Sequence, residues 1–220
     1  MNRRQNEALS FLISIYYKEY GPFNLEELAK LAARRDFGWD MYAYRHPKDN
    51  VWRPVRDIPE LREILLKNFP IQAGDQGPAG GHVFKDKNSK LIEVSPADAG
   101  YCAWENAENV CKNFSFNGYK DWRLPTKDEL LESSGFISSQ IRQKENTVQT
   151  NELILHWSNE RKKDSATAVI TCVVEDKYVQ NPTNGTSGGH YVNKDGIKIG
   201  IEKQLPVTEW HPVRPVRNLN

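Results

Sequence analysis

The sequence predicts an α+β protein in which a small domain is followed by a larger one. Short β-branched and aromatic runs alternate with amphipathic stretches along the 220 residues. Between two such groups lies a segment rich in Gly, Pro, Gln and Ala, and 220 residues can form two domains of common size. We therefore expect domains at residues 1–69 and 82–220, joined by a Gly/Pro linker at 70–81.

The sequence of the first domain predicts two helices and several short strands. Residues 11–17 are β-branched and aromatic, typical of a strand, and Tyr20 to Phe23 contain Gly-Pro, which predicts a turn. Asn24 with Glu27 three residues later predicts a capping box at the start of a helix. Further on, residues 41–45 predict a strand, 51–54 a short edge strand, and Pro59 the first turn of another helix.

These residues also carry a family resemblance over about residues 12–66. The strings Tyr16-Tyr17, Gly21-Pro22-Phe23, Leu25-Glu26-Glu27-Leu28, Tyr44-Arg45 and Trp52 resemble a GYF-type domain, specifically the bacterial GYF-like variety. The signature Gly-Tyr-Phe of that family would fall at Arg35-Asp36-Phe37, where only Phe37 matches. The resemblance implies an aromatic surface that holds a proline-rich or extended peptide. Its candidate residues are Tyr17, Phe23, Trp39 and Trp52. The alternative is that these rings fill the core of a small domain.

The second domain predicts strands at 82–84, 91–94, 156–160 and 166–174, and it ends with Val213-Arg214-Pro215-Val216-Arg217. Its clearest helix is 103–114, whose apolar face includes Cys111 as a small core residue. Thr126 with Glu129 predicts a capping box for a second helix. Residues 181–189 are polar and rich in Gly, which predicts an exposed loop.

Several strings in this half resemble one further family, over about residues 74–217. They are Gly-Pro-Ala-Gly-Gly at 77–81, the Asp-Trp-Arg-Leu-Pro-Thr segment at 121–126, Trp157-Ser158-Asn159-Glu160 and the terminal 213–217 run. They resemble the C-terminal domain of the collagen-like adhesin (Lcl) family, which implies a C-type-lectin-like fold with two helices and small twisted sheets. In this interpretation Trp122, Arg123 and Trp157 are architectural, with Arg123 bound to carbonyl or carboxylate partners.

No motif in the sequence predicts catalysis or a bound metal. The five histidines form no H-x-x-x-H pair, and C-x-x-C and G-x-S-x-G do not occur. The three cysteines, Cys102, Cys111 and Cys172, are an odd number that argues against a disulfide scaffold, and Cys102 and Cys111 are too far apart to bridge. We expect no catalytic residue, no metal and no cofactor.

The charge and the hydropathy of the sequence argue against two classes of partner, nucleic acids and the membrane interior. Thirty basic and 29 acidic residues leave a net charge of +1, without the basic excess of a nucleic-acid binder. No run approaches the roughly 18 apolar residues of a membrane span. The expected location is the cytoplasm, or the cell surface if a leader has been removed.

The sequence therefore favours a non-catalytic binding or adaptor protein, of undetermined oligomeric state. Its first domain would dock a protein or a proline-rich or extended peptide, and its second would recognise a protein or glycan. The resemblance to lectin-like folds places ligand contacts in a late loop, here Asn184, Ser187, His190 and Tyr191. Two alternatives stay open. One is an enzyme on the formylglycine-generating-like variant of the lectin fold; the other is a diversity-generating variable protein, since residues 181–193 contain three Asn.

Overall fold

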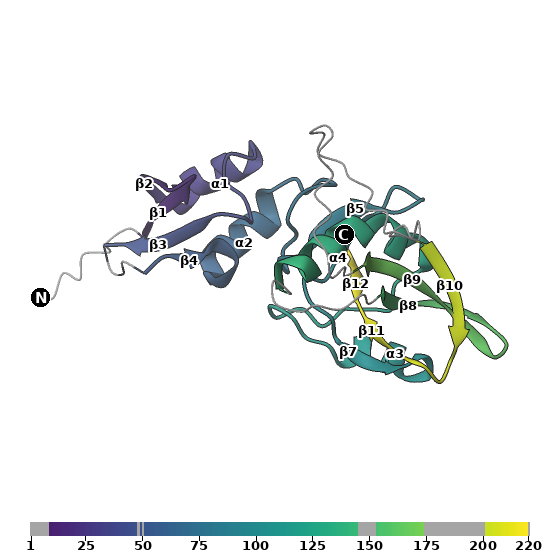
Figure 1. Ribbon diagram of the computed structural model, residues 1–220. Coiled ribbons are helices and arrows are strands. Elements are labelled where there is room, and N and C mark those ends of the chain that lie inside the picture. The colour runs from purple at the N-terminus through teal and green to yellow at the C-terminus, as the bar shows by residue number, and fades with distance from the viewer. Residues whose placement is uncertain (1–8, 48, 50, 145–152, 174–200, 220) are drawn as a thin grey trace, which may run out of the picture. The chain divides into compact units, whose positions relative to one another are not determined.

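The computed structural model describes residues 9–47, 49, 51–144, 153–173 and 201–219. It divides the chain into two compact units, Met1–Gly80 and Gly81–Asn220. The described residues form four α-helices and small antiparallel sheets (Figure 1). The predicted α+β class is confirmed at this level.

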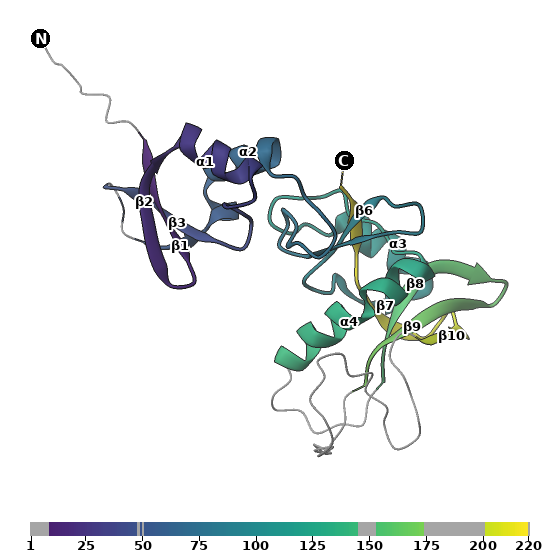
Figure 2. The same ribbon diagram turned by 90° about the horizontal axis from the view of Figure 1, so that it is seen from above.

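Unit 1 is a four-stranded antiparallel sheet with two α-helices. The strands lie in the order β2-β1-β3-β4. The elements are β1 (Ser10–Ile15), β2 (Lys18–Asn24), α1 (Leu25–Ala33), β3 (Tyr42–His46), β4 (Arg53–Pro54), a 3₁₀ turn (Val55–Asp57) and α2 (Pro59–Asn68). Both helices pack beside the strands (Figure 2).

The core of unit 1 follows from strand alternation. Phe11 and Ile13 of β1 are buried on one face, and Ala43 of β3 lies opposite Ile13. Leu28 and Ala32 of α1 and Leu61 and Leu65 of α2 cover this face. The predicted capping box is confirmed: Asn24 N donates to Glu27 Oε2 at 2.8 Å, and Glu27 N donates to Asn24 Oδ1 at 2.9 Å.

The turn predicted at Tyr20 to Phe23 is wrong, because these residues belong to β2. The chain reverses instead at Tyr16-Tyr17, where both residues have positive φ, 48° and 64°. Pro22 is tolerated in β2 because this is an edge strand, in which half of the backbone N–H groups need no partner. One extra residue in β2 forms a bulge there, since Phe23 lies opposite Phe11 and Tyr20 opposite Ile13.

Hydrogen bonds from two arginine side chains attach the segment after α2 to unit 1. Arg35 donates to the Pro70 carbonyl at 2.6 Å and forms two hydrogen bonds with Asp75, at 2.6 and 3.0 Å. Arg56 likewise donates to Gln76 Oε1. These contacts place the predicted linker residues up to Gly80 in the first compact unit.

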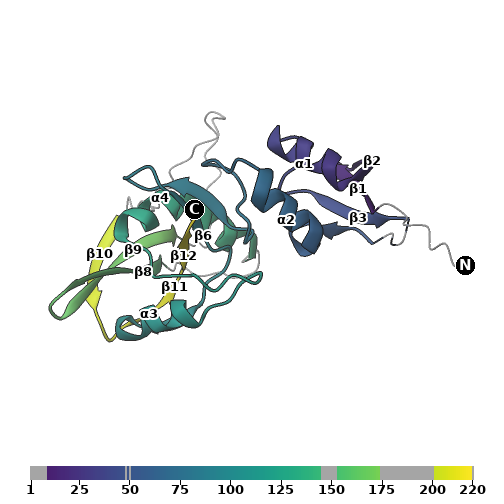
Figure 3. The same ribbon diagram turned by 180° about the vertical axis from the view of Figure 1, so that it is seen from behind.

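The described residues of unit 2 form three small antiparallel sheets and two helices. Its elements are β5 (His82–Lys85), β6 (Leu91–Val94), β7 (Gly100–Ala103), α3 (Trp104–Asn113), α4 (Lys127–Lys144), β8 (Leu153–Lys162), β9 (Ser165–Val173), β10 (Ile201–Pro206), β11 (Trp210–Val213) and β12 (Val216–Asn218). The sheet orders are β12-β6-β5, β11-β7 and β10-β9-β8. The last strand therefore lies in the same sheet as the first strand of the unit (Figure 3).

Most elements predicted in this half are confirmed, but β7, β10, β11 and β12 were not predicted as strands. Helix α3 occupies 104–113 and buries Ala107 and Cys111. Cys102 and Cys111 are both buried and free, as expected. At α4, Thr126 N donates to Glu129 Oε2 at 2.8 Å and Glu129 N to Thr126 Oγ1 at 3.2 Å, which confirms the second capping box.

Candidate functional site

The Asp-Trp-Arg-Leu-Pro-Thr segment is bound to the C-terminal strand of unit 2. Arg217 of β12 donates to both oxygens of Asp121, at 3.0 and 3.2 Å, and to the buried Glu93 at 3.0 Å. Its guanidinium also lies 4.0 Å from the ring centre of Tyr119 and 5.9 Å from that of Trp122. Because Arg217 is almost completely buried, these carboxylates and rings replace its hydration. The segment thus fixes the end of the chain.

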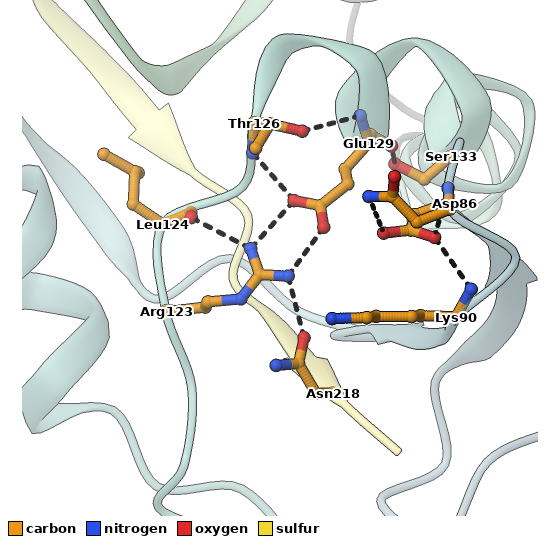
Figure 4. Close-up of polar contacts among 9 residues, drawn as sticks. Asp86, Lys90, Arg123, Leu124, Thr126, Glu129, Ser133 and Asn218 are labelled. Atoms are coloured by element: carbon orange, nitrogen blue, oxygen red, sulfur yellow. Dashed lines mark hydrogen bonds and ion pairs between the residues drawn. The ribbon is translucent and has the colours of Figure 1, made fainter. Parts of the chain in front are cut away.

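Arg123 makes a second connection between the same parts of the chain (Figure 4). Its guanidinium forms two hydrogen bonds with Glu129, at 2.8 and 2.6 Å, and donates to Asn218 Oδ1 at 2.9 Å. Its backbone pairs with Val216. The hydrogen bond with Glu129 is the main cause of the raised pKa of Arg123. The prediction of carboxylate and carbonyl partners for Arg123 is confirmed, and Trp122 and Trp157 are buried as expected.

A polar cleft of about 330 Å³ lies between the β5–β6 turn and the start of α4. Three of its four carboxylates, those of Asp86, Asp128 and Glu129, already have partners within the protein. Asp86 accepts backbone hydrogen bonds from Asn88 and Lys90, at 2.9 and 2.8 Å, and Asp128 pairs with Lys87 at 3.1 Å. Within the described residues no group of three or more His, Cys, Asp or Glu side chains could hold a metal ion.

His156 lies in a buried polar network between strands. Its Nε2 is 2.8 Å from Asp98 Oδ1 and its Nδ1 is 2.6 Å from Thr171 Oγ1. Arg214 Nε lies 2.7 Å from the same Asp98 oxygen. Burial lowers the pKa of His156, so its ring is neutral near pH 7. Because the ring is completely buried, this network supports the fold rather than contacting a solvent-borne ligand.

The two described cysteines do not supply a nucleophile. Burial raises the pKa of Cys102, and it raises the pKa of Cys111 to about 12. A thiol with such a pKa is protonated at neutral pH, and the thiolate is the reactive form. Both side chains instead pack with Trp157 in the core of unit 2.

A second cleft, of about 460 Å³, lies between the segment before β7 and one face of α3. Among the described residues, its lining contains no ionisable side chain and consists of Ala99, Asn106, Asn109, Val110, Asn113, Phe114 and Ser115. Helix α3 lies beside β7 and β11 (Figure 3). This cleft was not foreseen, although the spacing of the three asparagines was visible in the sequence.

A comparison with models of protein families identifies the family of unit 2. A model of the Lcl C-terminal domain matches residues 82–217. The chain belongs to the Lcl C-terminal domain family. A search of curated proteins finds no match. In the Lcl C-terminal domain of this chain, the matched region begins at β5 and includes the segment around Trp122 and the terminal Arg217.

The four aromatic residues predicted as a peptide platform do not form one surface. Trp39 is only 1% exposed and fills the core of unit 1, so its ring cannot meet a ligand and this prediction is wrong. Phe23 is partly buried against the same core, and Trp52 packs edge-on against Tyr44, with ring centres 4.7 Å apart. Tyr17 is fully exposed.

Exposed tyrosines instead gather where β1 and β2 meet. Tyr16 and Tyr17 form the turn and are fully exposed, and Tyr20 and Tyr42 are about half exposed. Tyr20 lies opposite Ile13 and Tyr42 opposite the adjacent Ser14, so the side chains of Tyr20 and Tyr42 project from opposite faces of the sheet at this end. We call these four residues the tyrosine end of the sheet. Strand register was needed to find it, because Tyr42 is distant in sequence from the other three.

The predicted ligand loop, with Asn184, Ser187, His190 and Tyr191, lies outside the described residues. No helix in the described part of the chain is long and apolar enough to cross a membrane.

Proposed function

We propose that this protein is a non-catalytic binding or adaptor protein with two binding parts. Unit 1 is a GYF-like domain that docks a proline-rich or extended peptide. The Lcl C-terminal domain, with a C-type-lectin-like fold, recognises a protein or a glycan. Its family supports an adhesin-like binding role. The cytoplasm remains the proposed location, or the surface after removal of a leader.

The tyrosine end of the sheet carries the proposal for unit 1. Exposed Tyr rings give a large contact area at a small cost in conformational entropy, and they suit the preordered ridges of a polyproline II segment. Tyr16 and Tyr17 are fully exposed, so their rings contribute little to the core of unit 1. Their left-handed backbone also costs about 1–2 kcal/mol per residue relative to glycine. A costly and unburied pair of rings is better explained by binding than by packing.

For the second domain, the loop residues Asn184, Ser187, His190 and Tyr191 remain the proposed ligand contacts. The Asn-Pro-Thr-Asn-Gly-Thr-Ser-Gly-Gly composition at 181–189 supports an exposed connection, since Gly and Pro remove packing and hydrogen-bond capacity. Loops supported by a rigid scaffold are frequent recognition elements. Replacing residues 181–191 by a Gly-Ser linker should abolish capture of protein or glycan ligands by this domain. Retained capture would remove the loop from the proposal.

Titration of the full chain with a decaproline peptide tests the peptide proposal. Calorimetry should detect binding to the wild type, and Tyr17→Ser should weaken it by about tenfold or more, the loss expected at a binding hot spot. Tyr101→Ser, an exposed tyrosine of the other unit, is the matched control and should bind normally. No binding of decaproline, or equal affinity of the two variants, would contradict the peptide proposal.

A further inference from the structure

The cleft over α3 has walls that are fixed by the fold. On one side the Ala99 N–H donates to the Val213 carbonyl at 2.8 Å, which attaches this segment to β11. On the other side α3 is anchored by the buried Ala107 and Cys111. Phe114 at the end of the helix packs against Trp122, with ring centres 5.7 Å apart. The walls of this shallow, open cleft are therefore held in place by the fold.

Three asparagines form a row along this cleft. Asn106, Asn109 and Asn113 follow a spacing of three and four residues, so they share one face of α3 and span about 10 Å along its axis. All three are exposed, and within the described residues none makes a side-chain hydrogen bond. Each amide therefore offers both a donor and an acceptor to a ligand.

Asparagine at these positions adds little to the stability of α3. Asparagine is a poor helix former and costs roughly 0.6 kcal/mol relative to alanine at an interior helical position. Asn106 and Asn109 lie inside α3, where no partner within the described part of the chain offsets that cost. An amide row without intramolecular use points to an external ligand.

The chemistry of the lining selects the ligand class. The charged residues of α3, Glu105, Glu108 and Lys112, do not line the cleft. A sulfated or carboxylated ligand would find no cation there, so the ligand is uncharged. Val110 and Phe114 add an apolar surface beside the amides. Such a surface accommodates the C–H face of a sugar ring, while planar amides bracket its neighbouring hydroxyl groups.

We propose that the α3 cleft binds a neutral oligosaccharide, an inference that rests on the proposed binding function of the Lcl C-terminal domain. The amide row gives the polar contacts, and Phe114 and Val110 give the apolar contact. The described residues that line the cleft are other residues than those of the loop proposed above.

Full-length protein on an array of neutral oligosaccharides (manno-, xylo-, cello- and chito-oligosaccharides) tests the proposal, with heparin as the sulfated arm. Neutral sugars that bind are then titrated while the side-chain NH₂ signals of the asparagines are followed by NMR. We expect the signals of Asn106, Asn109 and Asn113 to shift. Asn109→Ala/Asn113→Ala should weaken binding by about tenfold or more, since each lost hydrogen bond is worth about 1 kcal/mol. This variant should fold well because alanine is the better helix former.

Two variants serve as controls. Lys112→Ala lies on α3 outside the cleft, and Trp210→Ala removes an exposed ring of β11, so both should bind the neutral sugar normally. Binding to heparin alone, no binding to any neutral sugar, a loss in Trp210→Ala but not in the asparagine variant, or binding of peptides in place of sugars would overturn the cleft proposal. The decaproline and loop experiments report separately on the proposed function, so a failure there is distinguishable.

Discussion

The Arg123 guanidinium and the Glu129 carboxylate form a two-point ion pair, with N–O distances of 2.8 and 2.6 Å. The same carboxylate accepts the Thr126 N–H at 2.8 Å and so also caps α4. One buried side chain thus joins the start of a helix to the segment that holds the C-terminal strand.

Glu129→Ala should therefore lower the free energy of unfolding by about 2–4 kcal/mol, since it removes a helix cap and leaves a half-buried guanidinium without its main partner. Urea unfolding followed by circular dichroism measures the loss. Asp128→Ala is the control, because its ion pair with Lys87 is largely exposed and should contribute less than about 1 kcal/mol. A loss below that value for Glu129→Ala would show that the pair is not structurally important.

Trp122→Ala should destabilise unit 2 by about 3–5 kcal/mol, the usual cost of truncating a buried Trp. Trp122 is buried between Phe114 and Arg217, so its loss leaves a cavity and exposes the guanidinium. Thermal unfolding measures the effect, with the exposed Trp210→Ala as the control. Equal melting of Trp122→Ala and wild type would contradict the architectural role.

Local signals were enough to predict much of the fold. Both capping boxes and α3 depend on residues within one or two helical turns, and the sequence displays them directly. The strand β7 was not predictable in this way, because Gly100–Ala103 becomes a strand only by pairing with β11. Gly21-Pro22 has typical turn chemistry, yet the tertiary structure places it in an edge strand.

The candidate sites were harder to predict, for a related reason. The sequence shows that Trp39 and Tyr17 are aromatic, but only packing decides that the first is buried and the second exposed. Similarly, the asparagine spacing on α3 is local, whereas the opposite wall at Ala99 depends on its hydrogen bond to Val213. Surfaces made from distant segments have no signature in one sequence.

His156 should make stability depend on pH. Burial lowers its folded-state pKa below the ordinary value of 6.5, so the unfolded chain binds more protons as the pH falls through that value. The stability is therefore present above about pH 6.5 and declines as the solution is acidified. His82, whose pKa burial also lowers, acts in the same direction.

Denaturant midpoints between pH 8 and pH 5 should fall less steeply for His156→Gln than for wild type. An unchanged slope would exclude His156 as the titrating group, and His82→Gln measures the remaining share.

The segment after α2 should resist proteases while Arg35 holds it. Arg35 bonds to both Pro70 and Asp75, so Arg35→Ala should free residues 70–80 and increase cleavage there several-fold. Limited subtilisin digestion with mass spectrometry locates the cuts. Arg34→Ala is the matched control, because Arg34 pairs only with the exposed Asp36. A wild-type chain cut first within 85–135 would contradict the division into two units.

Replacing the two tyrosines of the Tyr16-Tyr17 turn should raise the stability of unit 1 and lower its affinity for decaproline. A two-residue hairpin turn with positive φ at both positions favours Asn-Gly, because Cβ crowds the backbone carbonyl oxygen in this conformation and Gly and Asn tolerate it best. Tyr16→Asn/Tyr17→Gly should therefore raise the free energy of unfolding of unit 1 by about 1–2 kcal/mol. The same variant removes both fully exposed rings, so it should lose affinity for decaproline while becoming more stable.

Urea unfolding and calorimetry on one preparation measure both effects. Tyr16→Ala/Tyr17→Ala separates them, because it lacks the rings but keeps a Cβ at both positions of positive φ, so it should lose affinity without the gain in stability. A more stable variant that binds decaproline as wild type does would show that the rings are not the binding groups. An unchanged stability would show that the turn stores no strain.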